Sequence, residues 1–166
     1  LGAYLLFLFY TTYKRCEVWK DSLTLWDNVL EQYPNVATAL NNRGKYYGEH
    51  LQKYDEAMRD LTKSIQVDPN YELAFNNRGI VYSIRKQYDL AIKDFDDAIK
   101  LKPNYIDAIH NRAISLANTK QFDRAIADFT KIIQDKPDKE ETYVARGYTY
   151  MPVSYTHLRA HETLMN

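Results

Sequence analysis

Cysteine and glycine are scarce in this chain, and neither sign of charge is in excess. Cys16 is the only cysteine among 166 residues, which excludes an internal disulfide and a zinc cage built from several cysteines. Lysine plus arginine equals aspartate plus glutamate, at 22 each, so the chain lacks the net positive charge that attracts nucleic acid. The five glycines are scattered and form no phosphate-binding loop. We therefore expect no nucleic-acid partner, no metal, no cofactor and no catalytic residues.

Proline is also scarce, but its positions are regular. Four of the five prolines stand 35, 34 and 34 residues apart: Pro34, Pro69, Pro103 and Pro137. Four arginines keep the same steps: Arg43, Arg78, Arg112 and Arg146. The tetrapeptide NNRG occurs at residues 41–44 and again at residues 76–79. A period of this length is typical of supersecondary units that stack against one another.

The unit from Tyr71 to Asn104 shows what each period encodes. Its first half carries apolar residues at helical spacing, and Asn70 is predicted to cap this helix at its N-terminus. The pattern then lapses, and Asp89 offers an acidic start for a second helix that Pro103 closes. Every repeat thus predicts a pair of helices, which we call A and B, and an all-α fold.

Small residues recur at matched places, where two crossing helices would approach closely. They are Gly44, Gly79, Ala113 and Gly147 in the A helices, and Ala57, Ala91 and Ala125 in the B helices. This order of small, large, aromatic and proline positions resembles the tetratricopeptide repeat, a helix-turn-helix of 34 residues. The resemblance covers Val18 to Met151. It implies an α-solenoid of antiparallel helix pairs in a right-handed superhelix.

The sequence departs from that family in two ways. The four repeat arginines stand where the family usually has leucine, and one extra residue lies near Gly48 to Gln52. The repeat boundaries predicted from the period are a half repeat of B type at 16–34, three repeats at 35–69, 70–103 and 104–137, and the first helix of a fourth at 138–151.

The N-terminal segment has a different character. Residues 1–13 are uncharged and mostly apolar, so residues 1–15 are interpreted as the end of a transmembrane helix, with a buried half-repeat helix as the alternative. The order of apolar span, Trp-containing half repeat and repeats resembles the transmembrane and tetratricopeptide repeat family, whose membrane part is similar to protein O-mannosyltransferases. The resemblance implies membrane association with the repeats in the periplasm or lumen. Lys14 and Arg15 favour the cytoplasm instead.

The repeat pattern stops after Met151. Residues Val153 to Thr163 resemble one translated reading frame of a transposase adaptor used in sequencing libraries, so we expect residues 152–166 to be foreign to the repeat protein. His157 and His161 share a helix face there, but zinc proteases place a glutamate directly after the first histidine, whereas Leu158 follows His157, and no metal site is predicted. A final A helix without its B helix, together with the apolar N-terminus, predicts self-association.

A carboxylate follows each of the first three repeat arginines at nearly constant distance. The three spacings are 17, 16 and 16 residues, and the predicted ion pairs are Arg43 with Asp60, Arg78 with Asp94, and Arg112 with Asp128. Such pairs would tie helix A to helix B or to the neighbouring repeat. The alternative is that both charges of each pair are solvated.

An asparagine also recurs once per repeat, at Asn42, Asn77 and Asn111, while the fourth repeat has Ala145. This series resembles the asparagine ladder in the repeat region of O-linked N-acetylglucosamine transferase, which implies that the amides hold the backbone of an extended peptide on the concave surface. Flanking residues that would tune the ladder are Asn41, Asn76 and His110. The alternative is that these amides satisfy neighbouring backbone or the next helix.

The function predicted from the sequence is a protein-interaction scaffold, tethered to a membrane, that binds an extended peptide or a partner helix on its concave surface. The rival prediction is that the repeats are the soluble appendage of a membrane glycosyltransferase whose catalytic part is absent from this sequence. Partners are therefore expected to be proteins or peptides, with the membrane contacted through the N-terminal segment.

Overall fold

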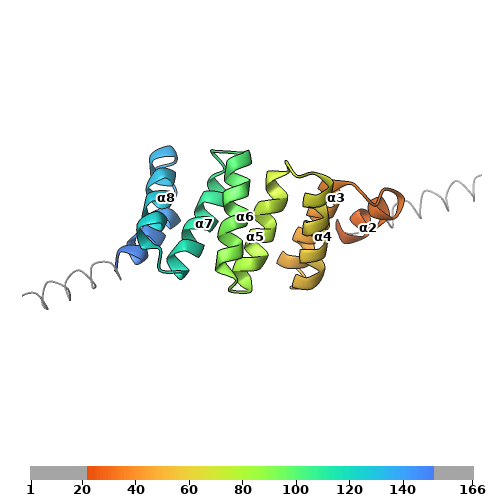
Figure 1. Cartoon of the computed structure of the whole chain (residues 1–166), viewed down its shortest axis with the longest axis horizontal. Helices are drawn as coiled ribbons and strands as arrows, with labels where there is room; N and C mark the ends of the chain where they lie inside the picture. The colour runs from red at the N-terminus through yellow and green to blue at the C-terminus, as the bar shows by residue number, and fades with distance from the viewer. Residues whose placement is uncertain (1–21, 152–166) are drawn as a thin grey trace, which may run out of the picture. The chain divides into compact units, whose positions relative to one another are not determined.

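A computed structural model gives the fold and describes residues 22–151 (Figure 1). The predicted end of a transmembrane helix at residues 1–15 and the predicted foreign tail at residues 152–166, with His157 and His161, lie outside the described residues. Among residues 22–151, no helix combines the length and the apolar character needed to cross a membrane.

The described part of the chain consists of helices joined by short turns and contains no strand. The helices are α2 (Ser22–Gln32), α3 (Ala37–Glu49), α4 (Tyr54–Val67), α5 (Glu72–Ile84), α6 (Tyr88–Leu101), α7 (Ile106–Asn118) and α8 (Phe122–Asp135), followed by a terminal helix at residues 140–151. From α3 to α8, helices of 13 and 14 residues alternate. The prediction of an all-α fold built from helix pairs is confirmed.

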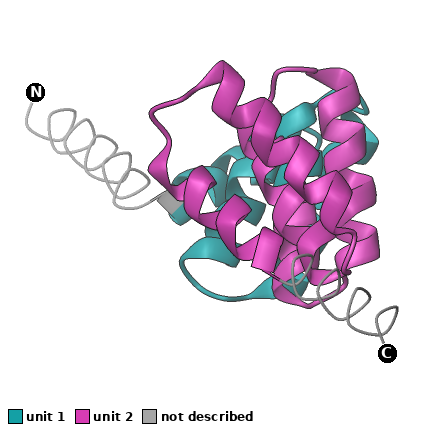
Figure 2. Cartoon of the chain, turned by 90° about the vertical axis from the view of Figure 1, so that its left-hand side faces the viewer, with its two compact units in different colours: residues 1–77 teal, residues 78–166 magenta. Residues whose placement is uncertain are grey.

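The chain forms two compact units, Leu1–Asn77 and Arg78–Asn166, and the boundary between them falls inside α5 (Figure 2). In unit 1, α3 packs against both α2 and α4. In unit 2, α7 packs against both α6 and α8. Helices α3 and α7 are thus each covered by their own B helix and by the B helix of the preceding repeat, which is how stacked repeats shield their apolar faces from water.

The two units bury separate groups of apolar side chains. In unit 1, Leu30, Ala39 and Leu40 form a buried cluster, against which Trp26, Val29 and Val36 pack. In unit 2 the buried cluster is larger and consists of Ile92, Ile109, Ala113, Leu116, Ala125, Phe129 and Ile132. Burying a side chain of the size of Phe129 stabilises the fold by about 1.5–3 kcal/mol.

Two glycines allow the A and B helices to approach closely. A Cβ atom on Gly44 would lie 2.9 Å from Cγ of Leu61 and 3.2 Å from the backbone oxygen of Ala57. A Cβ atom on Gly79 would lie 2.6 Å from Cε1 of Phe95. In the terminal helix, by contrast, a Cβ atom on Gly147 would meet no atom of residues 22–151 within 4 Å. The small residues therefore mark the A to B crossing in the repeats where both helices are described.

The turns between A and B helices share one conformation. Gln52, Lys86 and Lys120 have φ angles of 53°, 58° and 62°, in the left-handed region. After Lys86, the amide of Gln87 donates to the carbonyl of Tyr82 at 2.9 Å, the bond that closes a Schellman motif. In the first repeat the corresponding bond runs from Lys53 to Tyr47, one residue further back. The extra residue of that repeat is thus accommodated in the turn.

The predicted helix cap at Asn70 is wrong. Helix α5 begins at Glu72, two residues later, and the backbone N–H of Asn70 donates to Oδ1 of Asp68 at 3.0 Å. Asn70 is therefore part of a turn that Asp68 organises, because a carboxylate can accept a hydrogen bond from the backbone two residues further on.

Candidate functional site

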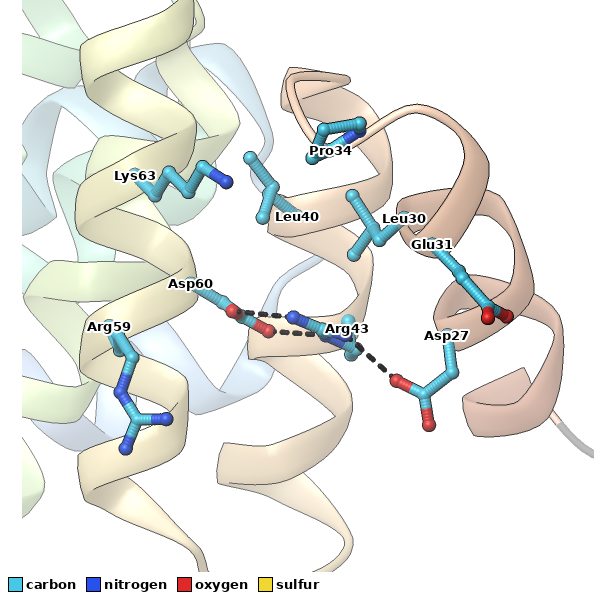
Figure 3. Close-up of a pocket in the computed structure, with 9 residues that line it drawn as sticks. All are labelled: Asp27, Leu30, Glu31, Pro34, Leu40, Arg43, Arg59, Asp60 and Lys63. Carbon is cyan, nitrogen blue, oxygen red and sulfur yellow. Dashed lines mark hydrogen bonds and ion pairs between the residues drawn. The ribbon is translucent and has the colours of Figure 1, made fainter.

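Arg43 joins three helices in unit 1 (Figure 3). Its Nε and Nη2 donate to the two carboxylate oxygens of Asp60 on α4 at 2.6 and 2.9 Å. Its Nη1 donates to Oδ1 of Asp27 on α2 at 2.8 Å. The paired, parallel bonds to Asp60 are the strong geometry of arginine with carboxylate.

The same arrangement recurs twice in unit 2. Nε and Nη2 of Arg78 donate to Asp94 at 2.7 and 2.8 Å. Those of Arg112 donate to Asp128 at 2.8 and 2.7 Å, while its Nη1 donates to Asp96 at 2.6 Å. The structure thus brings together all three arginine and aspartate pairs singled out in the sequence.

These pairs are removed from solvent. The side chains of Arg78 and Asp94 are 17% and 4% exposed, which does not fit the alternative of two solvated charges. The hydrogen bond to Asp60 raises the pKa of Arg43 above its ordinary value. Burial raises the pKa of Asp94, and the hydrogen bonds from Arg78 oppose that rise. Because the charges compensate one another, these residues suit a structural role that holds the helices together.

Sequence reasoning missed one partner each of Arg43, Arg112 and Arg146. Asp27 and Asp96 stand 16 residues before Arg43 and Arg112, on the B helix of the preceding repeat. In the terminal helix, Nη1 of Arg146 donates to Oγ1 of Thr130 at 3.3 Å, again 16 residues earlier. The signal was available, since the same spacing that found the carboxylates after each arginine also finds these residues before it.

The predicted ladder asparagines of unit 1 bond to one another. Nδ2 of Asn77 donates to Oδ1 of Asn41 at 2.8 Å, and Nδ2 of Asn41 donates to Oδ1 of Asn42 at 3.2 Å. Nδ2 of Asn76 donates to Oδ1 of Asn77 at 3.4 Å. Asn41 and Asn76 are buried, whereas Asn42 and Asn77 are partly exposed. The flanking residue Asn41 therefore links one A helix to the next, which is the alternative role considered for these amides.

In unit 2 the corresponding residues are His110 and Asn111 on α7 and Ala145 on the terminal helix. Asn111 is partly exposed. The Nε2 atom of His110 is buried and has no hydrogen-bond partner in the described part of the chain. Burial lowers the pKa of this imidazole, and the nearby Lys139 lowers it further. An uncharged His110 is thus the form that fits this site.

A pocket of about 430 Å³ opens between α2 and α4 in unit 1 (Figure 3). Leu30 and Leu40 are buried beside it, and the ion pair of Arg43 with Asp60 spans it. Its lining carries as many acidic as basic side chains: Asp27, Glu31, Asp60, Arg43, Arg59 and Lys63. Among residues 22–151 no group of three or more His, Cys, Asp and Glu side chains is arranged to hold a metal ion. The lining charges of the pocket therefore balance and give it no strong charge for an ionic ligand.

Comparison with known proteins agrees with the repeat seen in the helices. Models of the tetratricopeptide repeat match residues 37–71 and 73–105. Similar solved structures include MamA, at 25% identity and a TM-score of 0.72, covering 78% of this chain and 75% of that one. No curated protein is significantly similar in sequence.

Two further similar structures contain peptides. The first is the first repeat domain of Spaghetti (RPAP3) bound to the HSP90 peptide SRMEEVD, at 24% identity and a TM-score of 0.69, covering 71% of this chain and 93% of that one. The second is the second repeat domain of human RPAP3 in complex with the HSP70 peptide SGPTIEEVD, at 24% identity and a TM-score of 0.64. The match covers 68% of this chain and 93% of that one. Residues 37–71 and 73–105 are thus tetratricopeptide repeats, and the chain has the fold of a tetratricopeptide repeat domain.

Proposed function

We propose that this chain is a protein-interaction module that binds an extended peptide through side chains of its A helices. The observation that carries the proposal is the fold, which the chain shares with two repeat domains whose structures hold peptides of HSP90 and HSP70. Extended binding surfaces are a general feature of proteins built from stacked helical repeats.

Unit 1 offers amides to such a peptide. Among the hydrogen bonds of the described residues, Asn42 takes part only as an acceptor, so its two N–H groups are available to a guest carbonyl. Asn77 donates one N–H to Asn41 and accepts one hydrogen bond from Asn76. Its amide keeps a second N–H and a second lone pair that a guest peptide could use. Each amide would contribute about 1 kcal/mol, and micromolar binding requires about 8 kcal/mol, so apolar contacts must supply the rest.

Unit 2 offers an apolar groove of about 320 Å³. It lies between α7, α8 and the terminal helix, and its lining residues are Ile114, Ala117, Asn118, Phe122, Phe129, Ala145, Tyr148 and Thr149. Ile114 and Tyr148 are exposed to 40% and 66%. The groove supports the proposal because it suits an apolar side chain of a peptide that runs along the A helices.

The test is selection of binders from a displayed library of random peptides, with the labelled peptide SRMEEVD as a second probe. We expect micromolar binders. For those binders, Asn42→Ala and Asn111→Ala should each raise the dissociation constant about fivefold. Asn104→Ala, in an exposed turn, should leave it unchanged. Failure to enrich any peptide, or equal affinity for all three variants, would contradict the proposal.

The predicted membrane tether is a separate part of this proposal. It is supported by the uncharged, apolar sequence of residues 1–13. Flotation of the full chain with phosphatidylcholine vesicles, compared with a chain that begins at residue 22, would test it. Equal recovery of both chains with the vesicles would contradict the tether and leave the peptide-binding proposal unaffected.

A further inference from the structure

A side-chain hydrogen bond joins neighbouring A helices in unit 1, but the residues at the equivalent positions in unit 2 do not form it. In unit 1, Asn77 on α5 donates to Asn41 on α3. The counterparts in unit 2, counted from the repeat arginines, are Ala145 on the terminal helix and His110 on α7. Alanine has no side-chain donor, and the buried Nε2 of His110 has no hydrogen-bond partner among the described residues.

The surroundings of His110 disfavour a charged imidazole. On α8, the ring of Phe129 meets the imidazole edge to face, with ring centroids 5.7 Å apart. The charged groups that act on His110 are Asp107 on α7 and, at the start of the terminal helix, Lys139 and Glu141. Nζ of Lys139 lies 3.8 Å from Oδ1 of Asp107 and 4.0 Å from Oε1 of Glu141. Both carboxylates are therefore already paired with the ammonium group of Lys139.

Within the described part of the chain, the arginine of the terminal helix makes a weaker polar contact with the preceding B helix than the arginines of α3 and α7 do. Arg146 donates to the neutral Thr130 at 3.3 Å, whereas Arg43 and Arg112 have carboxylate partners on two helices. Ala145 packs against the buried cluster of unit 2, but a Cβ atom built on Gly147 would have no atom of the described residues within 4 Å. Segments with few buried contacts open locally at a lower free energy than the core.

We propose that His110 makes the contact between α7 and the terminal helix sensitive to pH: opening of residues 140–151 exposes the imidazole, which then accepts a proton and keeps the helix open. Burial lowers the pKa of His110 in the closed state, while in the open state the imidazole regains its ordinary pKa of about 6.5. The stability of the closed state is therefore fully present above pH 6.5. It is lost as the pH falls from there toward the lowered pKa.

Hydrogen exchange of the amides of residues 143–149 in the full chain, corrected for the intrinsic pH dependence of exchange, measures this opening. We expect the opening equilibrium to rise at least about twofold from pH 7.5 to pH 5.5. His110→Asn, which introduces the residue found at Asn41 and Asn76, should remove the rise. His50→Asn, in the exposed turn after α3, and the pair His157→Asn and His161→Asn in the tail should preserve it.

Ala145→Asn provides a second test that does not depend on removing His110. It places an amide donor opposite Nε2, as Asn77 stands opposite Asn41, and should reduce opening at pH 7.5 and steepen its pH dependence. In the unmodified chain the His110 ring resonance should titrate below pH 6.5. Exchange that does not change with pH, a pH dependence that survives His110→Asn, or no effect of Ala145→Asn would overturn the proposal.

Discussion

Single arginines decide how the helices of each repeat are joined, and Arg78 is the clearest case. Removing it leaves Asp94, whose side chain is only 4% exposed, without the two hydrogen bonds from the guanidinium. Because a buried carboxylate without a counter-charge is costly, we expect Arg78→Leu to lower the free energy of unfolding by about 3 kcal/mol. Urea unfolding followed by circular dichroism measures the change.

The double variant Arg78→Leu with Asp94→Leu distinguishes charge burial from lost packing. It should recover most of the loss, because an apolar pair of similar volume often replaces a buried ion pair at no cost. The matched control is Lys45→Ala, in the exposed pair with Glu49, which should change stability by less than about 0.5 kcal/mol. A double variant as unstable as Arg78→Leu would contradict this explanation.

The sequence predicted some residue contacts and not others, for a physical reason. An arginine and an aspartate at constant spacing attract each other wherever the fold brings them near, so the pair of Arg43 with Asp60 could be inferred from the period. An amide can donate to or accept from almost any polar group, so spacing alone could not show that Asn77 bonds to Asn41. The direction in which such a side chain points depends on packing.

At the scale of helices, two glycines in equivalent positions should respond oppositely to the same substitution. Gly79→Ala would place a methyl group 2.6 Å from Cε1 of Phe95, and we expect it to destabilise the chain by about 1–3 kcal/mol. The methyl group of Gly147→Ala would meet no atom within 4 Å in the part of the chain that the structure describes. This change should stabilise the terminal helix by about 0.5–1 kcal/mol, because alanine is the better helix former.

Thermal unfolding of the two glycine variants provides the measurement. Each variant serves as the control for the other, since the substitution and the secondary structure are the same and only the opposing helix differs. Equal shifts of the unfolding temperature in the same direction would contradict this prediction. They would show that the short distance between Gly79 and Phe95 does not determine which residue is tolerated at position 79.

The residues with left-handed φ angles in the turns between A and B helices are of types that disfavour this conformation. Lysine at a φ angle of 58° is strained by its Cβ atom, and glycine is the usual residue after a helix that ends in this way. We therefore expect Lys86→Gly to stabilise the chain by about 0.5–1 kcal/mol in urea unfolding. Lys93→Gly, in the exposed middle of α6, should destabilise it by about 1 kcal/mol. Destabilisation by Lys86→Gly would contradict the role assigned to this turn.

The period in the sequence predicted the alternation of A and B helices and the approximate position of the turn between them. It did not predict the backbone conformation at the helix ends. A lysine gives no indication of a left-handed φ angle, so the conformation of Lys86 and Lys120 was not foreseen. Asn70 was misassigned because asparagine suits both helix caps and turns, and here its own backbone N–H donates to Asp68 in the turn that precedes α5.

At the scale of the whole molecule, stability should follow the sum of contacts between neighbouring helices, as in other repeat proteins. The arginines illustrate this. Arg43 and Arg112 each reach the preceding B helix through a carboxylate, at 2.8 and 2.6 Å, while Arg146 reaches only the hydroxyl of Thr130. The terminal helix should therefore show the weakest protection from hydrogen exchange among the described helices from α3 onward.

Thr130→Asp would give the terminal helix the contact that α3 and α7 already have. The new carboxylate would stand 16 residues before Arg146, the spacing of Asp27 from Arg43, and should stabilise residues 140–151 by about 0.5–1 kcal/mol. Hydrogen exchange of residues 143–149 at pH 7.5 should slow about two- to fivefold, and less so in 1 M salt because the pair is partly exposed. Thr130→Asn, similar in shape but neutral, is the control. Equal protection in both variants would show that the charge at this position does not hold the helix.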